Sequence, residues 1–189
     1  VVAEGKTLYE HTMDKKLLKR LLAFGKERGI ALGVTMENGD YYTAPEEVER
    51  IDVLRWGETS RHFEDPMKLL ELPVRTLAYI GGPDRVRELE EHFPECKFFM
   101  FAGKTGADVV ENEASKAEGL KRLCEYYGMD LSQTVAFGDS MNDFEIVSRA
   151  GIGIAMGNSV EELKAAADYV TDPIDRDGVW NACRHFGWI

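Results

Sequence analysis

The sequence has little cysteine, few basic side chains and no long apolar run, and each shortage excludes a class of protein. Its three cysteines, Cys96, Cys124 and Cys183, form no CxxC pair. Their odd number favours unpaired thiols in a reducing compartment over a disulfide framework or a cysteine-bound metal. No apolar run approaches the roughly 18 residues of a membrane helix, and no signal peptide is recognisable. We therefore expect a cytoplasmic protein with no membrane partner.

The charged residues are mostly acidic, with 34 Asp and Glu against 23 Lys and Arg, and the formal net charge is -11. Proteins that bind nucleic acid normally present a basic face, so we expect no nucleic-acid partner. An acidic protein that handles phosphate needs local positive potential from a metal ion, a lysine or backbone amides. The length of 189 residues and the hydrophobic content of 44% suit one large globular domain or two small ones.

Residues 1–112 mix hairpin strands with helices, a pattern that predicts a small α+β sandwich. The run Glu4-Gly5-Lys6 predicts a turn between two short strands within residues 1–12. The pair Asn38-Gly39 predicts a second hairpin. Further strands are predicted at 30–36, 41–44, 74–80, 97–101 and 107–112, and helices at 14–28, 45–54, 84–92 and, in short form, after Pro66.

From about residue 113 strands alternate with helices, which predicts βαβ units and a parallel sheet. The predicted strands cover 134–137, 151–155 and 168–171, and the predicted helices cover 115–127, 140–149, 160–167 and 178–186. Three parallel strands make a thin sheet, and an unpaired edge would expose apolar surface and free hydrogen-bonding groups. We therefore expect this region to borrow a strand or to hide its edge by self-association.

A candidate site follows the strand predicted at 134–137. Asp139 stands just past the carboxyl end of that strand, the edge at which open α/β sheets bind ligands. If a helix starts at the next residue, Asp139, Asn142 and Asp143 share one face of its first turn. Two carboxylates and an amide form a hard oxygen site suited to Mg2+. The alternative is that Asp139 is a helix N-cap and that Asp143 is a first-turn acid stabilised by the helix dipole. These residues alone leave the metal site and the helix cap equally open.

Lys116 is a second candidate, at the predicted start of the helix over 115–127. The helix dipole disfavours a cation at this end, so a lysine here makes more sense beside an anion. The alternative is an ordinary solvated surface lysine.

Three other motifs are misleading. The GKT of 103–105 would need a glycine at Phe98 to complete a phosphate-binding loop, and a strand follows where a helix is required. The glycines of GIGIAMG over 151–157 miss the spacing of a dinucleotide-binding turn. The run IDRDG over 174–178 resembles a nucleophile motif, but no apolar strand precedes it directly, so a loop that caps the last helix is the better interpretation.

The motifs taken together resemble a known family. VAFGDSMNDFEIVSRAGIGIAMGNSVEELKAAADYVTDPIDRDGV closely resembles the C-terminal part of Cof-type phosphatases of the haloacid dehalogenase superfamily. ASKAEGLKRLCEYYGM resembles the family's SKGxALxxL segment, and GKTLYEHTMD resembles its passage into the cap domain. The resemblance covers nearly the whole chain in order, with residues 14–106 matching in pattern only.

The resemblance implies an α/β fold, with a partial Rossmann-like core of parallel sheet and flanking helices and an inserted α+β cap domain. Residues 1–12 and 113–189 would form the core, and residues 13–112 would form the cap. It also implies Mg2+-dependent hydrolysis of small phosphorylated metabolites. Tyr41, Tyr42 and Trp56 are candidate substrate contacts of the cap, although burial in its core is the simpler interpretation for each.

The resemblance also implies roles for single residues. Asp139 matches the family's metal-ligating aspartate, and Asn142 and Asp143 match positions that orient phosphate and support the metal. Lys116 matches the lysine that neutralises the phosphate and the nucleophile. Ala117 stands where the family usually has glycine, a departure that would tighten the turn beside Lys116 but still permits that role for the lysine.

One part of the family pattern is missing from the sequence. The family's reaction begins with an aspartate nucleophile in a DxDGT motif, and a second aspartate two residues on acts as acid and base. The sequence contains neither, and it begins at Val1 instead of Met. We therefore expect a phosphatase without its N-terminal core segment, inactive as an isolated fragment. A non-catalytic binding module and a phosphomutase of the same superfamily are the alternatives.

Overall fold

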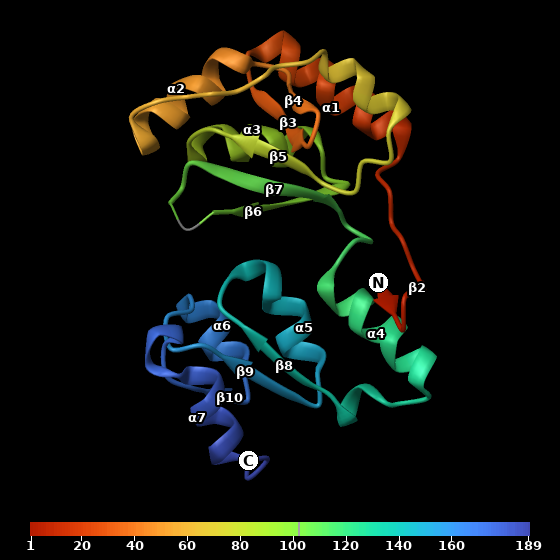
Figure 1. Cartoon of the computed structure of the whole chain (residues 1–189), viewed down its shortest axis with the longest axis vertical. Helices are drawn as coiled ribbons and strands as arrows, with labels where there is room; N and C mark the ends of the chain where they lie inside the picture. The colour runs from red at the N-terminus through yellow and green to blue at the C-terminus, as the bar shows by residue number, and fades with distance from the viewer. Residues whose placement is uncertain (102) are drawn as a thin grey trace. The chain divides into compact units, whose positions relative to one another are not determined.

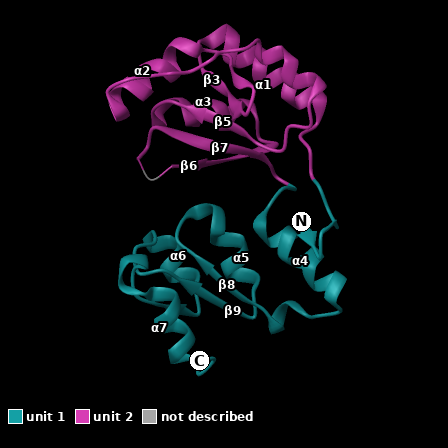
Figure 2. Ribbon diagram, viewed as in Figure 1, with its two compact units in different colours: residues 1–10, 113–189 teal, residues 11–112 magenta. Residues whose placement is uncertain are grey.

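The computed structural model describes residues 1–101 and 103–189 of the chain. The described chain divides into two compact units, drawn in different colours in Figure 2. Unit 1 comprises residues 1–10 and 113–189, and unit 2 comprises residues 11–112. Each unit builds its own sheet structure around its own apolar cluster.

Unit 2 is built on a five-stranded antiparallel sheet with the order β4-β3-β5-β7-β6 (Figure 1). Its strands are β3 (Ala31–Met36), β4 (Gly39–Tyr42), β5 (Leu77–Ile80), β6 (Cys96–Met100) and β7 (Gly106–Glu111). The hairpin predicted at Asn38-Gly39 is confirmed, with Met36 of β3 paired to Gly39 of β4. Each strand predicted for this region is present, although β5 begins at Leu77 and not at residue 74.

Helices pack on both faces of this sheet. One face carries α1 (Lys15–Arg28), α3 (Pro83–His92) and the 3-10 helix η1 (Pro66–Glu71). The helix α2 (Pro45–Trp56) packs Val48 into a smaller cluster with Ala31 and Tyr42. Leu32 belongs to the larger cluster and Ala31 to the smaller one. Since neighbouring strand residues point to opposite faces, α2 covers the face opposite to α1.

The ends of α1 follow directly from its sequence. The side chain of Asp14 accepts hydrogen bonds from the backbone N–H groups of Lys16 at 2.9 Å and Leu17 at 3.0 Å. Gly29 ends the helix in the left-handed conformation, with φ of 60°. These two caps satisfy helix-end groups that would otherwise be unpaired, which is why the predicted boundaries are confirmed.

Two of the three aromatic residues expected in the core of unit 2 are buried there. Tyr41 and Tyr42 are only 3% and 4% exposed. The same expectation for Trp56 is wrong, because its side chain is 67% exposed. Trp56 is the last residue of α2, and Gly57 turns the chain away with φ of 82°, so the side chain lies beyond the part of the helix that packs on the sheet.

Unit 1 contains the predicted parallel sheet, with the order β10-β9-β8. Its strands are β8 (Val135–Gly138), β9 (Ile152–Ala155) and β10 (Tyr169–Val170). The predicted N-terminal hairpin is also present, as β1 (Val2–Ala3) and β2 (Lys6–Thr7). The helices are α4 (Lys116–Tyr127), α5 (Phe144–Arg149), α6 (Glu161–Ala166) and α7 (Gly178–His185).

The parallel sheet of unit 1 and the antiparallel sheet of unit 2 confirm the predicted α/β fold class. Within unit 1, β8 pairs only with β9 and therefore forms an edge of the sheet. Val135 on this strand is 40% exposed. Among the described residues, no helix combines the length and the apolar character needed to cross a membrane.

Candidate functional site

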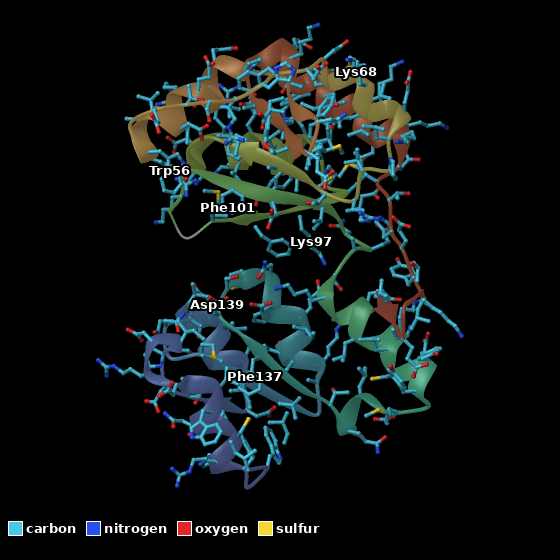
Figure 3. All side chains as sticks on the ribbon, in the orientation of Figure 1. Trp56, Lys68, Lys97, Phe101, Phe137 and Asp139 are labelled. Carbon is cyan, nitrogen blue, oxygen red and sulfur yellow. The ribbon has the colours of Figure 1, made fainter. Side chains whose placement is uncertain are left out.

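The candidate site begins where β8 ends. Gly138 is its last residue, and a Cβ atom added there would lie 2.5 Å from Cβ of Asp143 and 2.8 Å from Cγ2 of Val147. Only glycine fits so close to the following turn. The backbone at the end of β8 therefore passes close to the Asp143 side chain. Asp139, the next residue, lies just past the carboxyl end of the strand and is labelled in Figure 3.

The turn after β8 differs from the predicted helix. Residues 141–143 form the 3-10 helix η3 (Met141–Asp143), and α5 begins only at Phe144. The reason is the Asp143 side chain, whose Oδ2 accepts hydrogen bonds from the backbone N–H of Asp139 at 3.0 Å and of Ser140 at 3.4 Å. By folding back on the turn, Asp143 holds the residues before it in a tight loop.

Lys116 and Asp143 form an ion pair inside unit 1. Lys116 is the first residue of α4, after Ser115, whose hydroxyl accepts from the backbone N–H of Glu118 at 3.1 Å. The Nζ atom of Lys116 donates a hydrogen bond to Oδ1 of Asp143. The Lys116 side chain is 52% exposed while that of Asp143 is only 8% exposed. The sequence predicted an anion beside this lysine, and a buried carboxylate stands there.

The side-chain amide of Asn142 uses its oxygen in a hydrogen bond within the turn. Its Oδ1 accepts a hydrogen bond from the Ser140 hydroxyl at 2.6 Å. This fixes the amide so that its NH2 group is left to donate elsewhere. Sequence reasoning did not foresee this role for Ser140, although a hydroxyl within the GDSMND run was a visible signal.

Asp139 is the exposed carboxylate of the turn. Among the described residues none donates a hydrogen bond to its side chain, in contrast to Asp143, which has donors on both oxygens. An exposed, unengaged carboxylate is the group of this turn that a cation can reach without breaking a bond. The site thus presents an open carboxylate, an amide donor and a half-exposed lysine.

The donor set fits Mg2+ as a partial site. Mg2+ prefers oxygen ligands, keeps several waters and is commonly held by one or two carboxylates plus substrate phosphate. Asp139 can provide one such carboxylate. Within the described ranges, 1–101 and 103–189, no group of three His, Cys, Asp or Glu side chains stands close enough to hold a metal ion by itself.

The local structure around the three misleading motifs can be compared with the expectations for each. The GKT run occupies a turn that leads into β7, as predicted. Gly153 lies inside β9. The IDRDG run includes the 3-10 helix η4 (Ile174–Arg176), followed by Asp177 at the start of α7. Asp177 makes no side-chain capping bond there, so the loop precedes the helix without capping it in the way we expected.

The chain was compared with known protein families and curated proteins. The model of the haloacid dehalogenase-like hydrolases matches residues 1–183. The chain is 38% identical over 198 residues to a phosphoglycolate phosphatase of Methanosarcina acetivorans, and the match covers 100% of this chain and 84% of that protein.

Solved structures give the same result. A sugar phosphatase of haloacid dehalogenase subclass IIB, BT4131, superposes with a TM-score of 0.80 at 28% identity, covering 96% of this chain and 70% of that one. The phosphatase BT1666 of Bacteroides thetaiotaomicron superposes with a TM-score of 0.84 at 25% identity, covering 94% of this chain and 66% of that one.

Proposed function

Because the chain belongs to the haloacid dehalogenase-like hydrolase family, we propose that it supplies the cap and the C-terminal core of a Mg2+-dependent phosphatase of small phosphorylated metabolites. One observation supports this most strongly. Lys116, the buried Asp143 and the open carboxylate of Asp139 gather just past the carboxyl end of β8. A cation-binding oxygen beside a lysine is the combination that phosphate chemistry requires.

Each residue of the turn has a proposed role. Asp139 offers its carboxylate to Mg2+, which when bound stabilises negative charge on the phosphoryl group. Lys116 is positive and half exposed, so it can balance the charge of a phosphate oxygen. The free NH2 group of Asn142 can donate a hydrogen bond to another phosphate oxygen. These three groups bind and orient the phosphate.

Asp143 contributes to the metal site in a different way. Its two oxygens are engaged by Lys116 and by the backbone N–H groups of Asp139 and Ser140. It therefore fixes where Lys116 and Asp139 stand, and its negative charge adds to the attraction of the site for a cation. Unit 1 corresponds in this proposal to part of the core, and unit 2 to the cap.

The proposal includes the absence of turnover by the isolated chain. Hydrolysis in this mechanism passes through an aspartyl-phosphate, formed by an aspartate nucleophile. We assign that role to no residue of this sequence. A protein that carries the missing group would be active, and we expect it in the cytoplasm, consistent with three cysteines that form no disulfide among the described residues.

The relatives suggest the first substrates to test. Phosphoglycolate is named for the Methanosarcina acetivorans relative, and sugar phosphates are named for BT4131. Both are small phosphate monoesters, so a panel of these two classes with an aryl phosphate as a generic reference covers the proposed range.

The test pairs intact mass with activity. The protein from its native source would be weighed, and its hydrolysis of an aryl phosphate would be measured with Mg2+ and with a chelator. A mass above the 21.3 kDa of this chain, with Mg2+-dependent turnover that Asp139→Ala removes, would support the proposal. A protein of 21.3 kDa that starts at Val1 and turns over nothing would favour a binding module instead.

A further inference from the structure

Unit 2 contains a cavity of about 220 Å3 at one end of its sheet. It is lined by residues 29–31 between α1 and β3, by Tyr79 and Ile80 of β5, and by Glu47 and Arg85 in the first turns of α2 and α3 (these elements are labelled in Figure 1). An apolar cavity of roughly 150 Å3 holds benzene, so this one has room for a small organic molecule. A hollow with a few convergent polar groups is the usual form of a ligand site.

Small residues keep the cavity open. Gly29 ends α1 in the left-handed conformation, and a Cβ atom added there would meet no other atom within 4 Å. Ala31, which opens β3, carries only a methyl group. The end of the sheet between α1 and β5 is therefore not filled by side chains of these residues.

Glu47 gives the cavity a negative charge on the side of α2. Arg50, which does not line the cavity, donates to the two carboxylate oxygens at 2.6 and 2.7 Å. These hydrogen bonds hold the pKa of Glu47 below its ordinary value, so the carboxylate is ionised at neutral pH. A carboxylate has about four lone-pair sites, so each oxygen can still accept a hydrogen bond from a ligand.

Arg85 gives the cavity a positive charge on the side of α3. Its Nε lies 3.0 Å from Oε2 of Glu88, and its Nη2 donates to the backbone carbonyl of Arg28 at 3.1 Å. These contacts hold the guanidinium in place, while none of the described residues accepts a hydrogen bond from its Nη1. Asp84, the acid of the same turn, does not line the cavity. A planar guanidinium with a donor to spare is well suited to a carboxylate.

Tyr79 lies near both charges. Burial raises the pKa of Tyr79 to about 12, and the charges of Glu47 and Arg85 shift it in opposite directions, which places both groups close to the phenol. The hydroxyl keeps its proton at neutral pH and donates it to the carbonyl of Gly82 at 2.7 Å. Its oxygen is left to accept a hydrogen bond from a ligand.

We propose that this cavity binds a small apolar α-amino acid, with the ammonium group at Glu47 and the carboxylate at Arg85. Such a zwitterion matches both charges, whereas a simple carboxylate would leave Glu47 without a partner and a simple amine would leave Arg85 without one. The ammonium group can also donate to the Tyr79 oxygen, and the apolar side chain would lie against Ile80 and Ala31. Binding would stabilise unit 2, a readout that is separate from phosphatase activity.

The test is isothermal titration calorimetry of the full chain with L-valine, and with L-alanine and L-leucine as a smaller and a larger probe. We expect saturable binding of at least one of them. Isovalerate is valine without its amine, and isobutylamine is valine without its carboxylate. Each should bind at least about tenfold more weakly than valine, because each leaves one charged group of the cavity unpaired.

Removal of each charge tests the assignment of the two ends. Glu47→Gln and Arg85→Gln should each lower the affinity for the amino acid by about tenfold or more. The matched controls are Glu46→Gln and Arg87→Gln, because these exposed residues belong to the same two helices and do not line the cavity. Both controls should bind as the wild type does.

Hydrogen exchange read by mass spectrometry locates the bound molecule. We expect the amino acid to slow exchange in peptides that contain residues 29–31 and 79–85 of unit 2. Exchange in the turn over 138–143 of unit 1 should not change, which distinguishes this cavity from carboxylate binding at Lys116.

Four results would overturn the proposal. One is that none of the three amino acids binds. Another is that isovalerate or isobutylamine binds as tightly as valine. The third is that the control variants lose as much affinity as Glu47→Gln and Arg85→Gln. The fourth is protection in unit 1 in place of unit 2.

Discussion

The two units of the chain differ in how completely they bury their sheets. In unit 2 the five-stranded sheet carries helices on both faces, and its main cluster joins α1 and α3 to side chains from all five strands. In unit 1 the buried cluster consists of Val147, Ala155 and Leu163, under a three-stranded sheet whose strand β8 is an edge. The unit with the candidate catalytic residues is therefore the less completely packed one.

Because of this difference, we expect most of the folding stability to come from unit 2 and the candidate chemistry to lie in unit 1. Apolar burial is the dominant stabilising term in folding, so unit 2 has the larger reserve of stability. In unit 1 the polar turn after β8 contributes hydrogen bonds in place of a large core. We infer that a change in unit 2 acts mainly on folding, whereas a change in the turn of unit 1 can act on folding, on chemistry or on both.

The largest expected effect comes from the core of unit 2. Leu21 of α1 is completely buried, and Leu21→Ala should lower the free energy of unfolding of unit 2 by about 2–5 kcal/mol, from lost transfer energy and the cavity left behind. Hydrogen exchange read by mass spectrometry can follow the two units separately. Leu163→Ala is the reverse control, since it should weaken unit 1 and leave unit 2 unchanged. Equal loss of protection in both units would contradict the comparison.

A smaller effect distinguishes the two aspartates of the turn. Asp143→Ala removes the acceptor of two backbone N–H groups and the partner of Lys116, and should destabilise unit 1 by about 1–3 kcal/mol. Asp139→Ala removes an exposed carboxylate that accepts no hydrogen bond from the described residues, and should change stability by less than about 0.5 kcal/mol.

Urea titration of both variants, with exchange of the Asp139 and Ser140 amides in Asp143→Ala, measures this difference. Should the two substitutions destabilise unit 1 equally, the structural role of Asp143 would be wrong.

The ion network of unit 2 predicts acid sensitivity. Burial raises the pKa of Asp40, but hydrogen bonds from Thr35, Arg61 and the backbone of His62 outweigh it and leave the pKa below its ordinary value. The unfolded state then takes up the proton first. The stabilising contribution is complete above the ordinary pKa, near 4, and is lost as the pH falls towards the lowered value.

Unfolding of unit 2 followed between pH 6 and pH 2.5 measures this loss. Asp40→Asn should flatten the pH dependence in that window. An equally steep dependence in the variant would assign the acid sensitivity to other carboxylates.

The smallest expected change in stability lies at the edge of β8. Val135 is 40% exposed, so Val135→Lys should alter the free energy of unfolding by less than about 0.5 kcal/mol. A lysine on an edge strand opposes pairing with another strand, so any self-association through this edge should fall. Light scattering of the variant beside the wild type would show it. An unchanged tendency to associate would argue that the edge is not where unit 1 meets a partner.

Much of the fold could be predicted from local sequence. The spacing of Leu17, Leu18, Leu21 and Leu22 gave the helix α1, and Gly29 gave its end. The alternation of strands and helices after residue 113 gave a parallel sheet, which the structure confirms. The resemblance to haloacid dehalogenase phosphatases, based on GDSMND and the residues after it, is confirmed by the match over residues 1–183. The assignment of cap and core stays a prediction.

The features that the sequence did not predict share a physical cause, because each depends on contacts between residues that a local sequence pattern does not contain. The helix expected from residue 140 starts at Phe144, because the Asp143 side chain bonds to the backbone before it. Trp56 is exposed because it lies beyond Asp52, the last buried residue of α2, and no pattern within the helix reveals where its packing ends. The pairing of Lys116 with Asp143 joins residues far apart in sequence and could not be read from either segment.

The central claim is that Asp139 serves chemistry while Asp143 holds the turn. The most direct test is the Mg2+-dependent turnover of the native protein carrying Asp139→Ala, measured beside its free energy of unfolding. We predict that turnover falls by more than about 100-fold while stability stays within about 0.5 kcal/mol of wild type. Turnover near the wild-type value in a folded Asp139→Ala variant would contradict the account.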